Sequence, residues 1–168
     1  FYHFYSEDDG GAISLEDYIP GNWLHVAMVI SNGNYKKFYV NAQLVHSSSV
    51  ATIPNDYGVP ITIGGIHRMY DWDMSQEGFL GLIDEVQIWN RALTSEEIQI
   101  KMIEQTQLIP ASEEGLLGYW PFDEGDESTL AYDMSMNGNT GSITGATYTF
   151  DTPAAIFGCT DPESPDYN

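Results

Sequence analysis

The sequence predicts an all-β sandwich that carries one short helix. Short apolar segments recur along the chain, and turn signals separate them at intervals of roughly 8–12 residues, which is typical of sandwiches. One segment alone has helical spacing, and it begins with an N-cap pattern at Thr94. The length of 168 residues suits about one domain with a real core.

The first half of the chain reads as a series of hairpins. Residues 23–31, WLHVAMVIS, are apolar on both faces, which predicts a central strand covered on both sides. Asn32-Gly33-Asn34 and Asn41-Ala42 are tight-turn signals that separate it from two further strands. The expected strands are residues 1–6, 12–15, 23–31, 35–40, 43–46 and 61–63.

The second half contains the strongest strand and the helix. Residues 79–89 are continuously apolar except for Asp84-Glu85 and Gln87. Thr94 and Glu97 have the spacing of a capping box, and helical spacing continues through about Thr106. The remaining expected strands are residues 116–122, 142–143 and 146–150.

Composition and charge exclude several function classes. The net charge is −20, from 25 acidic and 5 basic residues, so nucleic acids and anionic membranes are repelled. The acidity has two explanations, solubility in a salty or calcium-rich medium and carboxylates that hold divalent cations. Cys159 is the one cysteine, so no internal disulfide or zinc pattern exists. No apolar run of about 18 residues and no signal peptide is visible.

Three pairs of segments resemble the laminin-G-like family of concanavalin A-like lectin/glucanase jelly rolls in its bacterial form. They are residues 23–30 with 37–45, residues 61–65 with 79–98 (FLGLIDEVQIWNRALTSEEI), and residues 114–125 with 133–143. Ala42 stands where the family usually has glycine. The resemblance implies a jelly-roll β-sandwich with one short helix. It also implies an incomplete N-terminus, because the family usually has further strands before the position of Phe1.

The resemblance also suggests how the chain is divided. Residues 1–109 are expected to form the jelly-roll core, and residues 110–152 a C-terminal strand segment that completes or extends the sandwich. Residues 153–168 form an acidic, Pro-rich tail that begins a linker or the next module. The tail resembles a short acidic sequence of long secreted surface proteins of Bacteroidetes-type bacteria. The chain is therefore expected to be a piece of a larger extracellular protein.

Asp84 is the first candidate metal ligand. Strand alternation would place it on an apolar face, where an unpaired carboxylate is costly to bury. The resemblance implies a structural calcium ion at this aspartate. The alternative is a carboxylate that accepts backbone N–H bonds from a neighbouring loop.

A second candidate calcium site is the sequence DMSMNG. Asp133, Ser135 and Asn137 place oxygens at alternate positions before a glycine, as in the first half of a calcium loop, and Asp123 adds a carboxylate nearby. Thr144 stands where an EF-hand needs glutamate, so this is not an EF-hand. The alternative is a polar Asn-Gly turn.

The candidate ligand-binding residues lie in the long irregular segment between residues 66 and 78. Aromatic rings stack on the apolar face of a sugar, and carboxylates accept its hydroxyl protons. The alternative is that Trp72 packs against the rim of the sandwich. The candidate residues are His67, Tyr70, Asp71, Trp72 and Asp73.

No catalytic residues are identified. Glycoside hydrolases of this fold use paired carboxylates on one strand, and no E-x-D-x-x-E-type strand occurs here. We therefore expect a non-catalytic, calcium-stabilised module for carbohydrate binding or adhesion in a bacterial surface protein. Its partners would be a glycan and neighbouring domains, with no membrane insertion. The alternatives are a spacer without a ligand and an accessory domain of a polysaccharide-degrading enzyme.

Overall fold

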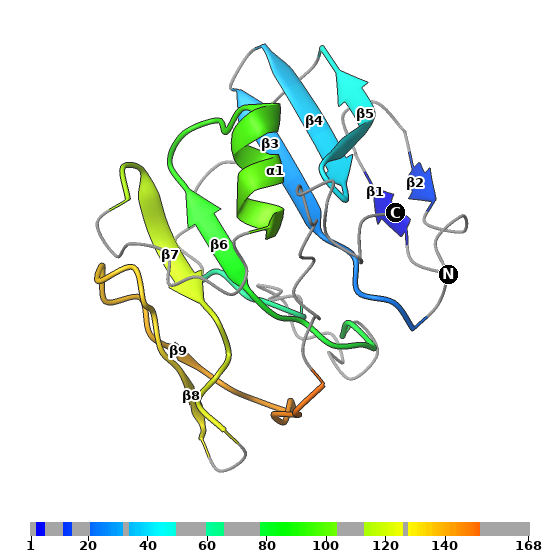
Figure 1. The fold of residues 1–168 in the computed structure, drawn as a ribbon. Coiled ribbons are helices and arrows are strands. Elements are labelled where there is room, and N and C mark those ends of the chain that lie inside the picture. Colours follow the sequence, from blue (N-terminus) through cyan, green and yellow to red (C-terminus); the bar gives the residue numbers. More distant parts are fainter. Residues whose placement is uncertain are drawn as a thin grey trace, which may run out of the picture.

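The computed structural model describes residues 3–5, 12–14, 21–31, 34–49, 60–65, 78–103, 113–125 and 128–151. Within them the chain forms nine strands in four small antiparallel sheets, together with one α-helix (Figure 1). The predicted all-β class with one short helix is confirmed. The elements are β1 (His3–Tyr5), β2 (Ala12–Ser14), β3 (Val26–Ser31), β4 (Tyr35–Val40), β5 (Gln43–Ser48), β6 (Val86–Trp89), α1 (Ser95–Ile103), β7 (Leu116–Trp120), β8 (Leu130–Ala131) and β9 (Gly141–Ser142).

The largest described sheet has the strand order β3-β4-β5, and the predicted Asn41-Ala42 turn connects β4 with β5. Between β4 and β5, Asn41 and Ala42 have φ angles of 48° and 59°, as a type I′ turn requires. Asn41 also holds the start of β3, because its side-chain oxygen accepts the His25 N–H at 3.0 Å and its own N–H donates to the His25 carbonyl at 2.8 Å. Ala42 therefore adopts the left-handed conformation that the usual glycine would adopt more easily.

Helix α1 begins at the predicted capping box. The Glu97 N–H donates to Thr94 Oγ1 at 3.2 Å, and the Thr94 N–H donates to Glu97 Oε2 at 2.7 Å. Ile98, which is 1% exposed, packs against Val29 of β3 and Tyr39 of β4. The helix thus covers one face of the β3-β4-β5 sheet (Figure 1). With nine residues α1 is too short to cross a membrane, and the described part of the chain has no longer apolar helix.

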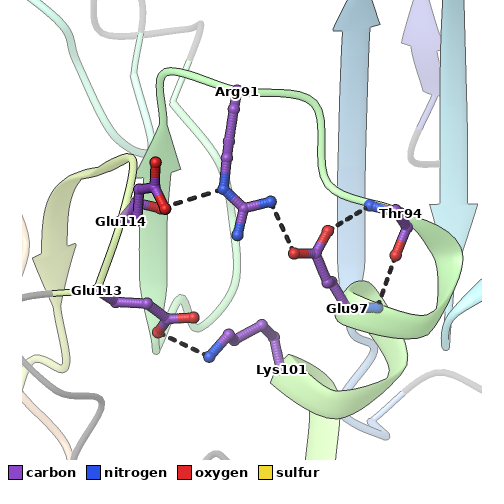
Figure 2. Close-up of polar contacts among 6 residues, drawn as sticks. All are labelled: Arg91, Thr94, Glu97, Lys101, Glu113 and Glu114. Carbon is purple, nitrogen blue, oxygen red and sulfur yellow. Dashed lines mark hydrogen bonds and ion pairs between the residues drawn. The ribbon is translucent and has the colours of Figure 1, made fainter.

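Strand β7 pairs with β6 and is also joined to the helix by polar contacts (Figure 2). The Arg91 Nε–H donates to the carbonyl of Glu114, just before β7, at 3.1 Å. The same guanidinium forms an ion pair with Glu97 of α1 at 2.7 Å. Arg91 therefore connects the helix to the beginning of β7.

A second cation makes the same connection one turn further along the helix. Lys101 Nζ lies 2.8 Å from the Glu113 carboxylate. Lys101 and Arg91 both lie near the ring of Trp89 on β6, at 5.7 and 5.3 Å from its centroid. The β6–β7 latch is our name for Trp89, Arg91 and Lys101 together with the acidic partners Glu97 and Glu113.

Several strand predictions are wrong in extent. Of residues 79–89 only β6 is a strand, and Leu80 is 84% exposed. Glu85 has a φ of 55°, a left-handed conformation that interrupts strand alternation just before β6. The face shared by Leu80, Asp84 and Val86 that alternation predicts is therefore absent.

The other differences concern short segments. Residues 61–63 and 146–150 are not strands, and of the two-residue pair β8–β9 only β9 overlaps a predicted strand, residues 142–143. Residues 23–25 do not belong to β3, which among the described strands has β4 as its one neighbour instead of being central. Met28 of β3 is accordingly 60% exposed.

Candidate functional site

Three carboxylates gather where the chain enters β6 and leaves β7. Asp84 and Glu85 immediately precede β6, and Asp123 follows β7 by three residues. Asp84 Oδ1 accepts the N–H of the adjacent residue Glu85 at 3.0 Å, whereas the alternative for Asp84 expects donors from a neighbouring loop. The Tyr119 hydroxyl of β7 donates to Glu85 Oε2 at 2.7 Å. The antiparallel pairing of β6 with β7 thus places Glu85 and Tyr119 together although 34 positions separate them.

The electrostatics of this cluster disfavour full ionisation. Burial is the main cause that raises the pKa of Glu85 to about 7; the Tyr119 hydrogen bond opposes it, and the charges of Asp84 and Asp123 add to it. The pKa of Asp84 is also raised, by burial and then by Asp123, against the Glu85 N–H bond. Burial and the Glu85 hydrogen bond raise the pKa of Tyr119, which therefore stays protonated as a donor.

A pocket of about 210 Å³ opens beside this cluster. Its lining combines apolar surface from the β7 end with two carboxylates, and it comprises Tyr119, Pro121, Asp123, Glu124 and Met134. Glu124 is fixed in place, because its two oxygens accept bonds from the Tyr132 N–H and from the Tyr148 hydroxyl, the latter at 2.6 Å. The pocket therefore has a rigid carboxylate on one side and the more exposed Asp123 on the other.

Asp133 lies in a different environment, on the edge of β7 that faces away from β6. Its Oδ1 accepts the N–H groups of Tyr119 at 3.0 Å and Ser135 at 2.9 Å, and its Oδ2 accepts the Asn139 N–H at 2.9 Å. Partial burial alone would raise the pKa of Asp133. Hydrogen bonds from Ser135 and from the N–H groups of Tyr119 and Asn139 outweigh burial and lower that pKa.

The loop that starts at Asp133 covers the free edge of β7. Ser135, which is 3% exposed, donates its hydroxyl to the Leu117 carbonyl at 3.1 Å. Asn139 Nδ2 donates to the same carbonyl at 2.8 Å, and the Tyr119 carbonyl accepts the Met134 N–H at 2.8 Å. Residues 133–139, which we call the edge loop, take the place of a neighbouring strand. They bond to the β7 backbone mainly through side chains.

Asn137 completes the edge loop. Its Nδ2 donates to the Leu116 carbonyl at 2.9 Å, to the Leu117 carbonyl at 3.2 Å and to Ser135 Oγ at 3.1 Å. These bonds are what the polar-turn alternative predicts for DMSMNG. The calcium prediction for Asp133 and Asn137 remains a prediction, although three N–H donors and three acceptors already engage these two side chains.

The predicted metal ligands therefore fall into two groups. The charge of Asp123 acts on Asp84 and on Glu85, so these three residues form one group. Asp133 and Asn137 belong to the edge loop. The carboxylate oxygens of the aspartates and the carboxamide oxygen of Asn137 are ligands that suit a hard cation such as calcium. Among the described residues, however, no three His, Cys, Asp or Glu side chains converge as a ready-made metal site.

The predicted ligand-binding residues lie outside the described residues. This applies to all of them: His67, Tyr70, Asp71, Trp72 and Asp73. Sequence reasoning missed one member of the carboxylate cluster, Glu85, and its hydrogen-bond donor Tyr119. Glu85 is adjacent to the predicted Asp84 and could have been named with it, whereas the contact with Tyr119 depends on the β6–β7 pairing.

Comparisons with known proteins address the family. A family model described as the concanavalin A-like lectin/glucanases superfamily matches residues 2–99. The matched segment contains β1 to β6 and the first half of α1, and it ends before β7 and the edge loop. None of the curated proteins matches the chain.

Two solved structures are similar to this chain at 25% sequence identity. One is a protein from Bacteroides ovatus with a provisional assignment as a carbohydrate-binding protein; the TM-score is 0.53, and the match covers 80% of this chain and 38% of that one. The other is an S-layer domain-containing protein from Clostridium thermocellum, with a TM-score of 0.42 and coverage of 49% and 40%. This chain therefore spans well under half the length of either protein.

Proposed function

Because this chain belongs to the concanavalin A-like lectin/glucanases superfamily, we propose that it is a carbohydrate-binding module without catalytic activity. The observation that carries the proposal is the family match over residues 2–99. The similarity to the Bacteroides ovatus protein supports it, since 80% of this chain is covered at a TM-score above 0.5. The match covers only 38% of the Bacteroides ovatus protein, which supports a role within a larger protein.

The proposed sugar-contacting residues are the aromatic and acidic side chains of the 67–73 segment. Trp72 and Tyr70 would stack on sugar rings, and Asp71, Asp73 and His67 would bond to hydroxyl groups. A glycan array, followed by calorimetry on any ligand found, tests this role. We expect Trp72→Ala to weaken binding at least tenfold.

Phe150→Ala is the matched control for this experiment. Phe150 is 86% exposed, so its truncation removes an accessible aromatic ring from a different segment. Equal binding by wild type and both variants would place the glycan elsewhere on the module. A wild-type protein that binds no glycan, with and without calcium, would contradict the proposal and favour a structural spacer.

We further propose that calcium stabilises the module through Asp84 and Asp123. Burial is the main cause that raises the pKa values of Asp84 and Glu85, and a divalent cation would offset the added repulsion from their carboxylate neighbours. Asp133 and Asn137 are less favourable positions, because backbone and side-chain partners already engage them. Bound calcium would draw the carboxylates together, and this chain's own residues would supply the oxygen ligands.

Thermal melting with calcium and with a chelator tests this second proposal. A ligand at 100 times its dissociation constant stabilises the native state by about 2.7 kcal/mol, so a clear rise in melting temperature is expected. Asp84→Ala should abolish the rise, and Asp133→Asn should preserve it. An unchanged wild-type melting temperature would show that the cluster holds no calcium. Secretion, cell-surface location and adhesion belong to the first proposal, that of a carbohydrate-binding module. Fractionation of the cells that produce the protein would test the location.

A further inference from the structure

The tripeptide Asn-Gly-Asn occurs twice in the chain, at residues 32–34 and at residues 137–139. Asparagine followed by glycine is chemically labile, because glycine leaves its backbone nitrogen uncrowded and able to attack the asparagine side chain. The two copies share their local sequence and differ in their position in the fold. The first connects β3 with β4, and the second belongs to the edge loop.

The second copy is held by a set of specific contacts. The Asn137 carboxamide donates to two β7 carbonyls and to Ser135 Oγ, at 2.9 to 3.2 Å. The Asn137 backbone N–H also lies 3.4 Å from Ser135 Oγ. Ring closure would move the carboxamide carbon toward the Gly138 nitrogen and break the bonds to β7. Reaction at this position therefore requires the edge loop to open first.

We propose that Asn137-Gly138 is a deamidation site gated by opening of the edge loop. The Gly138 nitrogen loses its proton to hydroxide and forms a bond to Asn137 Cγ. The Cγ–Nδ2 bond breaks, and Nδ2 leaves as ammonia. Water then opens the resulting succinimide at either carbonyl, which gives aspartate or isoaspartate. The step is a hydrolysis, and it needs no oxidant or other co-reactant.

The product would release the edge loop from β7. A carboxylate in place of the carboxamide has no N–H to donate and would face the Leu116 and Leu117 carbonyls, which are acceptors. The Leu117 carbonyl would keep the Asn139 and Ser135 donors, whereas that of Leu116 would lose its edge-loop partner. Deamidation would thus loosen the covering of the β7 edge in a single irreversible step.

The first experiment follows deamidation by peptide mapping with mass spectrometry. The folded protein, the protein in urea and a synthetic peptide of residues 134–141 are incubated at pH 8.5. The two Asn-Gly-Asn copies should react at similar rates in urea, because they share the tripeptide. In the folded protein, Asn137 should react at least about tenfold more slowly than in the peptide, which corresponds to about 1.4 kcal/mol of opening. Equal rates in folded protein and peptide would overturn the gating.

The second experiment measures the effect of the product. Asn137→Asp should lower the melting temperature by about 5 °C or more, and Asn32→Asp, the same change in the other copy, reports the effect of one added negative charge. If Asn137→Asp melts like wild type, the proposed release of the loop is wrong. If it does not fold, the rate comparison on the wild-type protein still decides the gating.

Discussion

Two carboxylates accept hydrogen bonds from the same tyrosine, and their pKa values are shifted in opposite directions. Asp133 accepts the backbone N–H of Tyr119, and Glu85 accepts its hydroxyl. The pKa of Asp133 is lowered, whereas that of Glu85 is raised to about 7. Asp133 has three N–H donors and little burial, while Glu85 has one hydroxyl donor, half-burial and two carboxylate neighbours. The extent of burial, and after it the number of donors and the charged neighbours, therefore separate the two groups.

The difference follows from how each carboxylate meets β7. An open strand edge presents N–H groups at fixed positions, and the edge loop supplies Asp133 where one of them needs an acceptor. Glu85 instead approaches the side-chain face of β7, where the one donor is the Tyr119 hydroxyl. Asp133 is thus part of the fold's backbone bonding. Glu85 is the group whose charge a ligand could change.

The largest expected effect is that of Asp133→Ala. The substitution leaves three N–H groups without their acceptor, and at about 0.5–1.5 kcal/mol for each bond we expect a loss of about 2 kcal/mol in unfolding free energy. Urea unfolding monitored by circular dichroism measures it. Asp151→Ala, at an exposed position, controls for the lost charge, and equal midpoints for both variants would contradict the structural role of Asp133.

The second prediction concerns Glu85→Gln, which should stabilise the calcium-free protein at pH 8. The folded-state pKa of Glu85 is raised above the unfolded one, so the contribution of this group to stability is highest below about pH 4.5 and falls as pH rises to about 7. Glutamine keeps an acceptor for Tyr119 without the charge. Discounted for the exposure of this half-buried group, the gain is about 1 kcal/mol.

Urea unfolding in a chelator from pH 4.5 to pH 8 measures this effect. Glu114→Gln is the control, because it removes one negative charge from an exposed side chain. A Glu85→Gln variant that keeps the wild-type pH profile would mean that Glu85 ionises normally. In that case the two carboxylates around Tyr119 would not differ as described.

The smallest effect is expected from His25, which extends the comparison to a cationic group. Its Nδ1 is buried and has no partner among the described residues, and burial lowers its pKa. The unfolded chain takes up the proton first, so this contribution to stability is complete above pH 6.5 and is lost as pH falls below it, by at most about 1.4 kcal/mol per pH unit. Unfolding of His25→Phe at pH 5.5 and pH 8 should show a smaller pH difference than wild type. An identical difference would show that His25 titrates normally.

Sequence reasoning succeeded where the signal is local. The Thr94–Glu97 capping box and the Asn41-Ala42 turn depend on residues within a few positions of each other, and both are confirmed. The apolar run from residue 79 failed as a strand, because a strand also needs a hydrogen-bonding neighbour that composition does not reveal. The strand begins only after Glu85, whose left-handed φ has no signature in the sequence.

The candidate site shows the same limit. The sequence predicts Asp84 as one candidate metal site and Asp133 and Asn137, with Asp123 nearby, as a second. The structure instead groups Asp123 with Asp84 in the carboxylate cluster and leaves Asp133 and Asn137 in the edge loop. The division depends on which side of β7 each residue approaches. That information arises from the β6–β7 pairing and from contacts over 14 to 34 positions, which residue spacing cannot supply.

The β6–β7 latch has a consequence for how the molecule responds to ionic strength. A chain of net charge −20 repels itself, so added salt should stabilise most of the fold by screening. Arg91 and Lys101, two of the five basic residues, instead form ion pairs that the same salt weakens. The Lys101–Glu113 pair is weakened less, because its side chains are less exposed to solvent. Salt would then stabilise most of the fold while weakening the attachment of β7 to the helix. The ionic strength of the surroundings would set how firmly β7 is attached to the helix.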